Sequence, residues 1–139
     1  MSDNRTIGWL NRALQHEFGA VQQYLAQSVL ARLLGDAEGA ERWRDEALEE
    51  LAHAERLMER LIQLGAAPSA GALPPARLGR GPQDFDGIVH AMEWQAVRLY
   101  QDAAEHAQRM RDEGTHALMQ ELLQAEVQHF RNAGRERIA

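Results

Sequence analysis

The chain has 139 residues and a mass of 15.6 kDa, which suffices for one ordinary domain but not for two. Hydrophobic residues make up 45% of it and charged residues 26%, a globular composition that excludes disorder. The formal net charge of -6 argues against a nucleic-acid partner, because proteins that bind nucleic acid carry a basic excess. Cysteine and lysine are both absent, which excludes disulfides, thiolate metal sites and Schiff-base chemistry.

The N-terminus gives no sign of targeting to a membrane. Residues 1–9 lack the apolar core of a signal peptide, and no apolar run approaches the ~18 residues that a membrane span needs. We therefore expect a cytoplasmic protein with no membrane partner.

Apolar residues recur at helical spacing in four segments. They predict helices over residues 5–34, 38–64, 83–112 and 115–134. Gly35 marks a turn after the first helix, Gly65 ends the second, and Thr115 is the predicted N-cap of the fourth. Residues 130–139 carry several charges and are interpreted as a tail and not as a packing helix.

The connections between these helices predict the topology. Short turns join the first two helices and the last two, so each pair should form an antiparallel hairpin. Residues 65–82 hold all four prolines and form a crossover long enough to travel the length of a bundle. Two hairpins joined by one long crossover make the ferritin-like variant of the all-α four-helix bundle. We expect residues 1–139 to form a single domain of this kind.

Four glutamates stand at positions where the helices should be apolar. Each lies about one turn from apolar residues of its own helix, which places it on the face that turns to the core. They are Glu17, Glu50, Glu93 and Glu126. Four buried carboxylates without partners would be very costly, so the pattern indicates that they share cations.

Two of the four glutamates have a histidine three positions later. Glu50 is followed by His53, and Glu126 by His129, so each pair lies on one helix face and can offer an oxygen and a nitrogen to one point. With Glu17, Glu93 and these pairs, the set is four carboxylates and two imidazoles, as in di-iron and di-manganese bundle proteins. Oxygen and nitrogen ligands without sulfur suit iron, with manganese as the alternative.

The spacing of these residues repeats within the chain. Glu17 and Glu50 are 33 positions apart, as are Glu93 and Glu126, and the whole pattern recurs after 76 positions. A third Glu-x-x-His sequence, Glu113 to His116, has no glutamate 33 positions before it and is interpreted as a coincidence. The repeat therefore favours a metal cage with internal twofold symmetry.

These residues resemble those of the bacterioferritins, within the ferritin-like superfamily. The resemblance extends from about Leu10 to His129 and includes the Gln22-Gln23-Tyr24 sequence after the first glutamate. It implies a di-iron centre, with two iron ions per subunit, that oxidises Fe(II) with dioxygen or peroxide. Its residues would have the following roles: terminal ligands Glu17 and Glu93, bridging ligands Glu50 and Glu126, imidazole ligands His53 and His129, and Tyr24 as a phenol near the ions.

The chain departs from the bacterioferritin pattern in two places. Bacterioferritins carry a haem-ligating methionine directly after the second-helix glutamate, where this chain has Leu51, so no haem is expected. Only ten residues follow His129, so the short fifth helix of the family is expected to be missing. We expect a homo-oligomer, at least a dimer across the first two helices, with a ferritin-like shell favoured over a free dimer.

The leading interpretation is thus a ferroxidase for iron storage or detoxification. One alternative is a rubrerythrin-like diiron peroxidase or oxidase, although the peroxidase usually needs a cysteine site that this chain lacks. The other alternative is a helical bundle that binds metal without catalysis.

Overall fold

The structure is a computed structural model that describes the backbone of residues 4–138 and the side chains of residues 4–132. Its helices are α1 (Asn4–Leu33), α2 (Ala37–Gln63), the 3-10 helix η1 (Pro82–Asp84), α3 (Phe85–Arg109) and α4 (Glu113–Ile138). No strand occurs among these residues, so the predicted all-α class is confirmed. None of the described helices is both long and apolar enough to cross a membrane.

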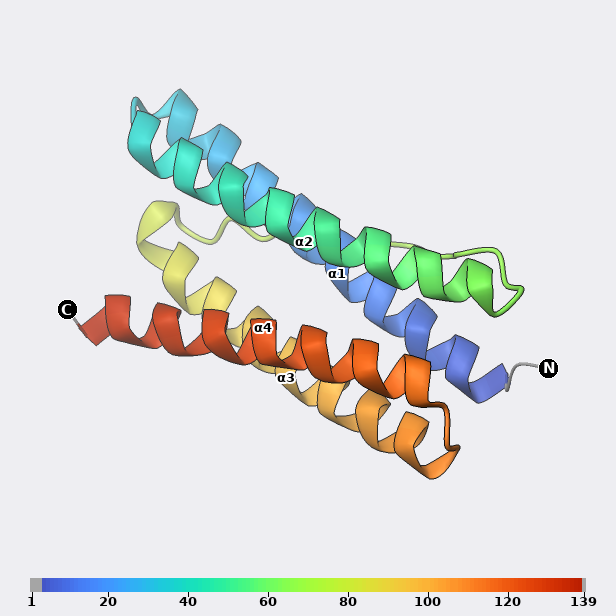
Figure 1. Ribbon diagram of the computed structural model, residues 1–139. Coiled ribbons are helices and arrows are strands. Elements are labelled where there is room, and N and C mark those ends of the chain that lie inside the picture. Colours follow the sequence, from blue (N-terminus) through green and yellow to red (C-terminus); the bar gives the residue numbers. More distant parts are fainter. Residues whose placement is uncertain (1–3, 139) are drawn as a thin grey trace.

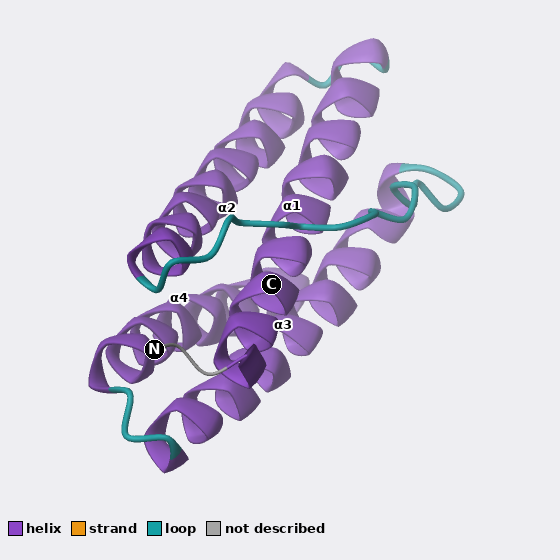
Figure 2. Cartoon of the chain, turned by 90° about the vertical axis from the view of Figure 1, so that its right-hand side faces the viewer, coloured by secondary structure: helices purple, strands orange, loops and turns teal. Residues whose placement is uncertain are grey.

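The helices form two antiparallel hairpins that pack on each other. In Figure 1, α1 lies beside α2 and α3 lies beside α4. The segment between α2 and α3 contains no helix until η1 and passes along α1, from one end of the bundle toward the other (Figure 2). The predicted topology, with two hairpins and one long crossover, is therefore confirmed.

Polar side chains of α1 hold the crossover in place. The hydrogen-bonded pairs are Asn11 with Ser69 (3.1 Å), Gln15 with Ala72 (2.7 Å) and Gln23 with Arg77 (2.6 and 2.9 Å). The partners follow one another in the same order on both segments, so the crossover runs in the same direction as α1. Gln23 is buried, and its amide both donates to and accepts from the backbone of Arg77, which fixes the crossover directly beside Tyr24.

The turn between α3 and α4 differs from the prediction. α3 ends at Arg109, and the N-cap of α4 is Asp112 and not Thr115, because the Asp112 carboxylate accepts a hydrogen bond from the Thr115 backbone N–H at 3.1 Å. Gly114 lies inside α4, where a Cβ atom would come within 2.8 Å of the Arg60 guanidinium. Arg60 bonds both Asp112 (2.8 Å) and Thr115 (2.9 Å), so this glycine makes room for an arginine and does not break the helix.

The prediction of a charged tail over residues 130–139 was wrong. α4 continues to Ile138, beyond the predicted end at residue 134, while Ala139 lies outside the described residues. The Phe130 ring stacks on the His90 ring with centroids 4.3 Å apart and also contacts the Trp94 ring at 5.6 Å. This contact packs α4 against α3 at Phe130.

Two apolar clusters fill the bundle, one on each side of the predicted acidic residues. The first cluster is built around Leu10, Leu14, Leu57, Leu61, Tyr100, Met119 and Leu122. The second is built around Ala20, Tyr24, Trp43, Ala47, Phe85, Val89 and Met92. Along α1, for example, Glu17 lies between Leu14 of the first cluster and Ala20 of the second, so the polar layer is enclosed at both ends by apolar packing.

Candidate metal centre

Each of the four α-helices places one glutamate in the layer between the two clusters. All four predicted glutamates are buried, with exposed fractions of 0% for Glu17, 2% for Glu50, 5% for Glu93 and 2% for Glu126. They reach the interior because each occupies the core-facing stripe of its helix, where its neighbours are leucine, alanine or valine. The structure thus brings together carboxylates that are far apart in the sequence.

Four of the predicted residues form one candidate ion position. Ligand atoms of Glu17, Glu50, His53 and Glu126 lie within 4.8 Å of one another. The His53 Nδ1 atom faces all three carboxylates, at 3.4 Å from Glu126, 3.6 Å from Glu50 and 3.7 Å from Glu17. We call this group the enclosed position, because Glu17 and His53 do not line the cavity described below.

A second candidate position lies next to the first. It comprises Glu93, Glu126 and His129, whose ligand atoms also lie within 4.8 Å of one another. Glu126 belongs to both groups, and the His129 Nδ1 atom is 3.4 Å from Glu50 Oε1, so Glu50 also reaches both. We call this group the open position. Together the two groups contain all six predicted ligand residues.

His129 is also drawn toward the surface. Its Nε2 atom pairs with Glu49 Oε2 at 2.6 Å, and its Nδ1 atom is 3.9 Å from Glu46 Oε2. Glu49 is 57% exposed, so the imidazole connects the buried layer with a carboxylate in contact with solvent. Within residues 4–132, whose side chains the structure describes, the acids that pair with His53 are all buried, so the two histidines differ in their surroundings.

The buried atoms of this layer provide a test of whether the residues fit a cation. Each of the six residues has one buried atom that lacks a hydrogen-bond partner in the structure: Glu17 Oε2, Glu50 Oε1, His53 Nδ1, Glu93 Oε2, Glu126 Oε1 and His129 Nδ1. Buried polar atoms are normally hydrogen-bonded, and leaving one unpaired costs about 1–3 kcal/mol. Cations would satisfy these atoms, and the oxygen and nitrogen donors fit iron or manganese.

Two tyrosines hold the glutamates of α1 and α3. The Tyr24 hydroxyl, which the resemblance places near the metal centre, donates to Glu93 Oε1 at 3.3 Å. The Tyr100 hydroxyl donates to Glu17 Oε1 at 2.6 Å, a contact that the sequence reasoning missed. A signal was present, because Tyr100 stands 76 positions after Tyr24 and so follows the same internal repeat as the glutamates.

Burial and mutual repulsion change the acidity of the layer. Burial raises the pKa of Glu93 to about 8 and that of Glu126 to about 7, and it raises the pKa of Glu17 well above its ordinary range. Burial alone would also raise the pKa of Glu50, but its neighbours Glu17, His129 and His53 outweigh burial and lower it. The layer therefore keeps protons on some carboxyl groups while Glu50 stays ionised.

The pKa values of the two histidines are also raised, but by their acidic neighbours and against the effect of burial. Burial would lower the pKa of His53, but its close contacts with the Glu126, Glu17 and Glu50 carboxylates prevail and raise it to about 12. Glu50 raises the pKa of His129 to about 10 against the effect of burial. Both imidazoles are thus protonated at neutral pH in the metal-free protein and must lose a proton before their Nδ1 atoms can bind a cation.

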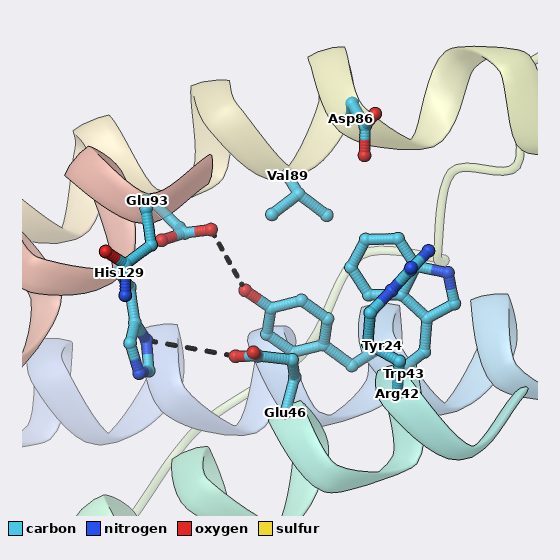
Figure 3. A pocket seen from close by; sticks show the side chains of 9 residues that line it. Tyr24, Arg42, Trp43, Glu46, Asp86, Val89, Glu93 and His129 are labelled. Carbon is cyan, nitrogen blue, oxygen red and sulfur yellow. Dashed lines mark hydrogen bonds and ion pairs between the residues drawn. The ribbon is translucent and has the colours of Figure 1, made fainter. Parts of the chain in front are cut away.

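A cavity of about 140 Å³ leads to the open position. Figure 3 shows Tyr24, Glu93 and His129 along its wall, with Trp43, Arg42 and Asp86 farther out. The Trp43 ring stacks on the Tyr24 ring with centroids 5.9 Å apart and an interplanar angle of 18°. Neither Glu17 nor His53 lines this cavity, so the open position is the one that borders it.

The third Glu-x-x-His sequence takes no part in either group. Glu113 and His116 both lie at the start of α4, and the His116 Nε2 atom is 3.4 Å from the Gln120 amide nitrogen. Among the residues that the structure describes, neither of them belongs to a group able to hold a metal ion. Glu113 and His116 can therefore serve as control positions for the two Glu-x-x-His pairs of the candidate centre.

The sequence of this chain is similar to those of known proteins of one family. The model of the ferritin-like domain family matches residues 7–135. Bacterioferritin from Rhodobacter capsulatus is 31% identical over 127 residues, covering 91% of this chain and 79% of that protein. Bacterioferritin from Brucella melitensis is 30% identical, covering 91% of this chain and 78% of that protein.

A solved structure of the Rhodobacter capsulatus bacterioferritin is similar over almost the whole fold. It superposes with a TM-score of 0.91 at 29% identity and covers 96% of this chain and 84% of that one. That structure is described as having a metal-free dinuclear site and a haem iron in a crystallographic special position.

The raised pKa values predict how the stability of the metal-free protein depends on pH. Between the ordinary value of 4.5 and the folded-state values of about 8 for Glu93 and about 7 for Glu126, the folded protein keeps protons that the unfolded chain has lost. The free energy of unfolding should therefore fall as the pH rises through this range, by about 1.4 kcal/mol per pH unit for each proton retained.

Denaturant unfolding at several pH values, with chelator present, measures this slope. The Glu126→Gln variant should flatten it, because an amide does not titrate. Equal slopes in the parent and Glu126→Gln would contradict the assignment of a retained proton to this layer.

Proposed function

We propose that this chain, which belongs to the ferritin-like family and has bacterioferritins as relatives, is a ferroxidase that oxidises Fe(II) to Fe(III) for iron storage or detoxification. The observation that carries the proposal is the set of buried ligand atoms without a hydrogen bond on all six residues of the candidate centre. Such a layer costs free energy in the metal-free protein, and cations would recover that cost.

Two Fe(II) ions per chain are the proposed substrate. Glu17, Glu50, His53 and Glu126 would hold one ion, and Glu93, Glu126 and His129, with Glu50 in reach, would hold the other. The two ions give up two electrons, which with two protons reduce dioxygen to hydrogen peroxide, or peroxide to water. Manganese would fit the same oxygen and nitrogen donors.

The residues of this chain would bind the cations in a buried layer, where isolated charges are unfavourable. The protons held by the buried carboxyls and by the two imidazoles leave as cations enter, so the charge of the layer changes less than the charge of the ions alone. His129, which contacts both Glu50 and the exposed Glu49, lies between the buried layer and solvent. The cavity beside Glu93 provides space from which ions or oxidant reach the open position.

The two alternatives differ from this proposal in what the chain must contain or do. A rubrerythrin-like peroxidase usually needs a cysteine site, and the sequence has no cysteine. A metal-binding bundle without catalysis would take up Fe(II) but oxidise it no faster than solution does.

Ligand variants test the ferroxidase directly. In stopped-flow absorbance on aerobic addition of Fe(II), the parent should show rapid growth of a ferric band that saturates at two irons per chain. His129→Ala and Glu126→Gln should each abolish the rapid phase, because each removes a donor atom from the open position.

The matched controls lie on the same helix. His116→Ala and Glu113→Gln alter the third Glu-x-x-His sequence, which the structure leaves outside the centre, and should retain the parental rate and stoichiometry. A parental rate in His129→Ala, or only slow background oxidation in the parent, would overturn the proposal.

Bacterioferritins hold haem through a methionine, and this chain lacks a methionine at that position. Leu51 lies on α2 at the position of the haem-ligating methionine, and its 38% exposed side chain has no donor atom. The described methionines lie elsewhere: Met58 and Met119 pack in or against the first cluster, Met92 in the second, and Met110 follows the end of α3. We derive no function through haem.

Reconstitution with haem checks this point. The parent should give no low-spin spectrum of the bis-thioether type, whereas Leu51→Met should gain one if two copies meet at this helix. A bis-thioether band in the parent, at one haem per two chains, would contradict the prediction.

Exposed apolar side chains on α1 and α2 support a homo-oligomer, at least a dimer and, by the resemblance, a shell. They include Leu25, Val29 and Leu33, four positions apart on α1, and Leu48 and Leu51 on α2. Burying such side chains between two copies removes apolar surface from water, at about 25 cal/mol per Å². A charge in this face should therefore weaken association.

Light scattering and sedimentation measure the assembly. The parent should have a mass of at least twice 15.6 kDa, and Leu48→Glu should shift it toward the monomer. Leu78→Glu is the control, because Leu78 is also an exposed leucine but lies in the crossover. A parent that is monomeric at all concentrations would contradict the prediction.

A further inference from the structure

The two tyrosine contacts at the centre are reciprocal. Tyr24 of α1 bonds Glu93 of α3, and Tyr100 of α3 bonds Glu17 of α1. Each tyrosine stands seven positions after the glutamate of its own helix but bonds the glutamate of the other helix. The internal twofold relation therefore extends beyond the six ligand residues to a pair of phenols that connect the two hairpins.

Each phenol engages one oxygen of its glutamate and leaves the other free. On both Glu17 and Glu93 the bonded atom is Oε1, while Oε2 is buried and has no hydrogen-bond partner in the structure. The Oε2 atom of Glu17 faces the enclosed position, 3.7 Å from His53 Nδ1. The phenol bond occupies one acceptor site of Oε1 and draws electron density from it, so a carboxylate held in this way presents Oε2 to an ion in preference to both oxygens.

The two contacts are unequal. The Tyr100–Glu17 bond is 2.6 Å long and both side chains are 0% exposed, with Tyr100 packed in the first apolar cluster. The Tyr24–Glu93 bond is 3.3 Å long, and both of its residues line the cavity shown in Figure 3. At the open position, moreover, the His129 Nε2 atom is engaged by the exposed Glu49.

From this geometry we propose that Tyr100 and Tyr24 are positioning residues that hold Glu17 and Glu93 as one-oxygen ligands, and that the tighter hold by Tyr100 makes the enclosed position the first to fill and the last to empty. The inference rests on the proposed metal centre and adds an order of filling to it. The enclosed position retains its ion, and the open position beside the cavity exchanges its ion with solvent.

Calorimetric and visible-absorbance titrations of the chelator-treated, assembled protein with Co(II) under argon test the order of filling. The parent should bind two ions per chain in two phases. Tyr100→Phe removes one hydroxyl and should weaken the first phase by about 10- to 100-fold, the usual effect of removing a hydrogen-bonding partner of a metal ligand. Tyr24→Phe is the matched control and should weaken the second phase while leaving the first unchanged.

Infrared difference spectra of the carboxylate stretches test the binding mode, which a merely structural role of the hydroxyl would not alter. With one equivalent of Co(II), the parent should show the wide splitting of a one-oxygen carboxylate, and Tyr100→Phe should show the narrow splitting of a two-oxygen one. Unchanged splitting, or an unchanged first phase in Tyr100→Phe, would overturn the proposal.

A third measurement avoids any change at Tyr100, in case the Phe variant does not fold. The chain has two tyrosines, so Tyr24→Phe leaves Tyr100 as the single phenol. Its ultraviolet resonance Raman bands should shift with the first equivalent of Co(II) and not with the second. A shift only with the second equivalent would overturn the order of filling.

These tests are independent of iron oxidation. Two-phase Co(II) binding with the expected variant effects, but without rapid Fe(II) oxidation, would uphold the role of the tyrosines and refute the ferroxidase. Rapid Fe(II) oxidation together with an unchanged first phase in Tyr100→Phe would uphold the ferroxidase and refute the role of Tyr100.

Discussion

Four carboxylates buried between two apolar clusters are the constraint on which this structure depends. Isolated charges in such a layer are very unfavourable, so each must be protonated, paired or bound to a cation. The protein uses the first two in its metal-free state: burial raises the pKa of Glu93 and Glu126, and His53 pairs with three carboxylates. Several atoms of this layer, His53 Nδ1 among them, still lack a hydrogen bond, and these are the atoms that the proposed ions would engage.

The apolar clusters, in turn, give this layer its shape. Leu14 and Ala54 on one side, and Ala20 and Ala47 on the other, are buried neighbours of Glu17 and Glu50 on their own helices. Tight packing limits how far a carboxylate can move, so the ligand atoms keep their separation without an ion present. Each cluster also supplies the tyrosine that bonds across the hairpins, Tyr100 from the first and Tyr24 from the second.

Much of this arrangement could be predicted because it depends on periodicity within single helices. A glutamate such as Glu17 in an apolar stripe must face the core, and the 33-residue spacing places its counterpart Glu50 at the same level of the neighbouring antiparallel helix. The turn residues and the proline-containing crossover likewise determine the order of the helices. These signals are local, so a single sequence suffices to detect them.

The features that the sequence did not reveal depend on contacts between helices. In the sequence, Tyr100 resembles any core tyrosine. Only the fold shows that its hydroxyl lies 2.6 Å from Glu17, which belongs to a different hairpin. Gly114 suggests a helix break when viewed alone, but in the fold it leaves space for the Arg60 guanidinium. Phe130 adjoins a charged segment, and only its stacking on His90 shows that α4 still packs against α3 at this position.

The crossover has a consequence for the equivalence of the two hairpins. Two identical, unconnected hairpins around a twofold axis would offer two equal ion positions. A single chain must join its halves by one segment, and here that segment forms side-chain hydrogen bonds with α1 through Asn11, Gln15 and Gln23, on either side of Glu17. The covalent link thus adds hydrogen bonds to the helix that carries Glu17, so the difference between the two ion positions begins with the connectivity of the chain.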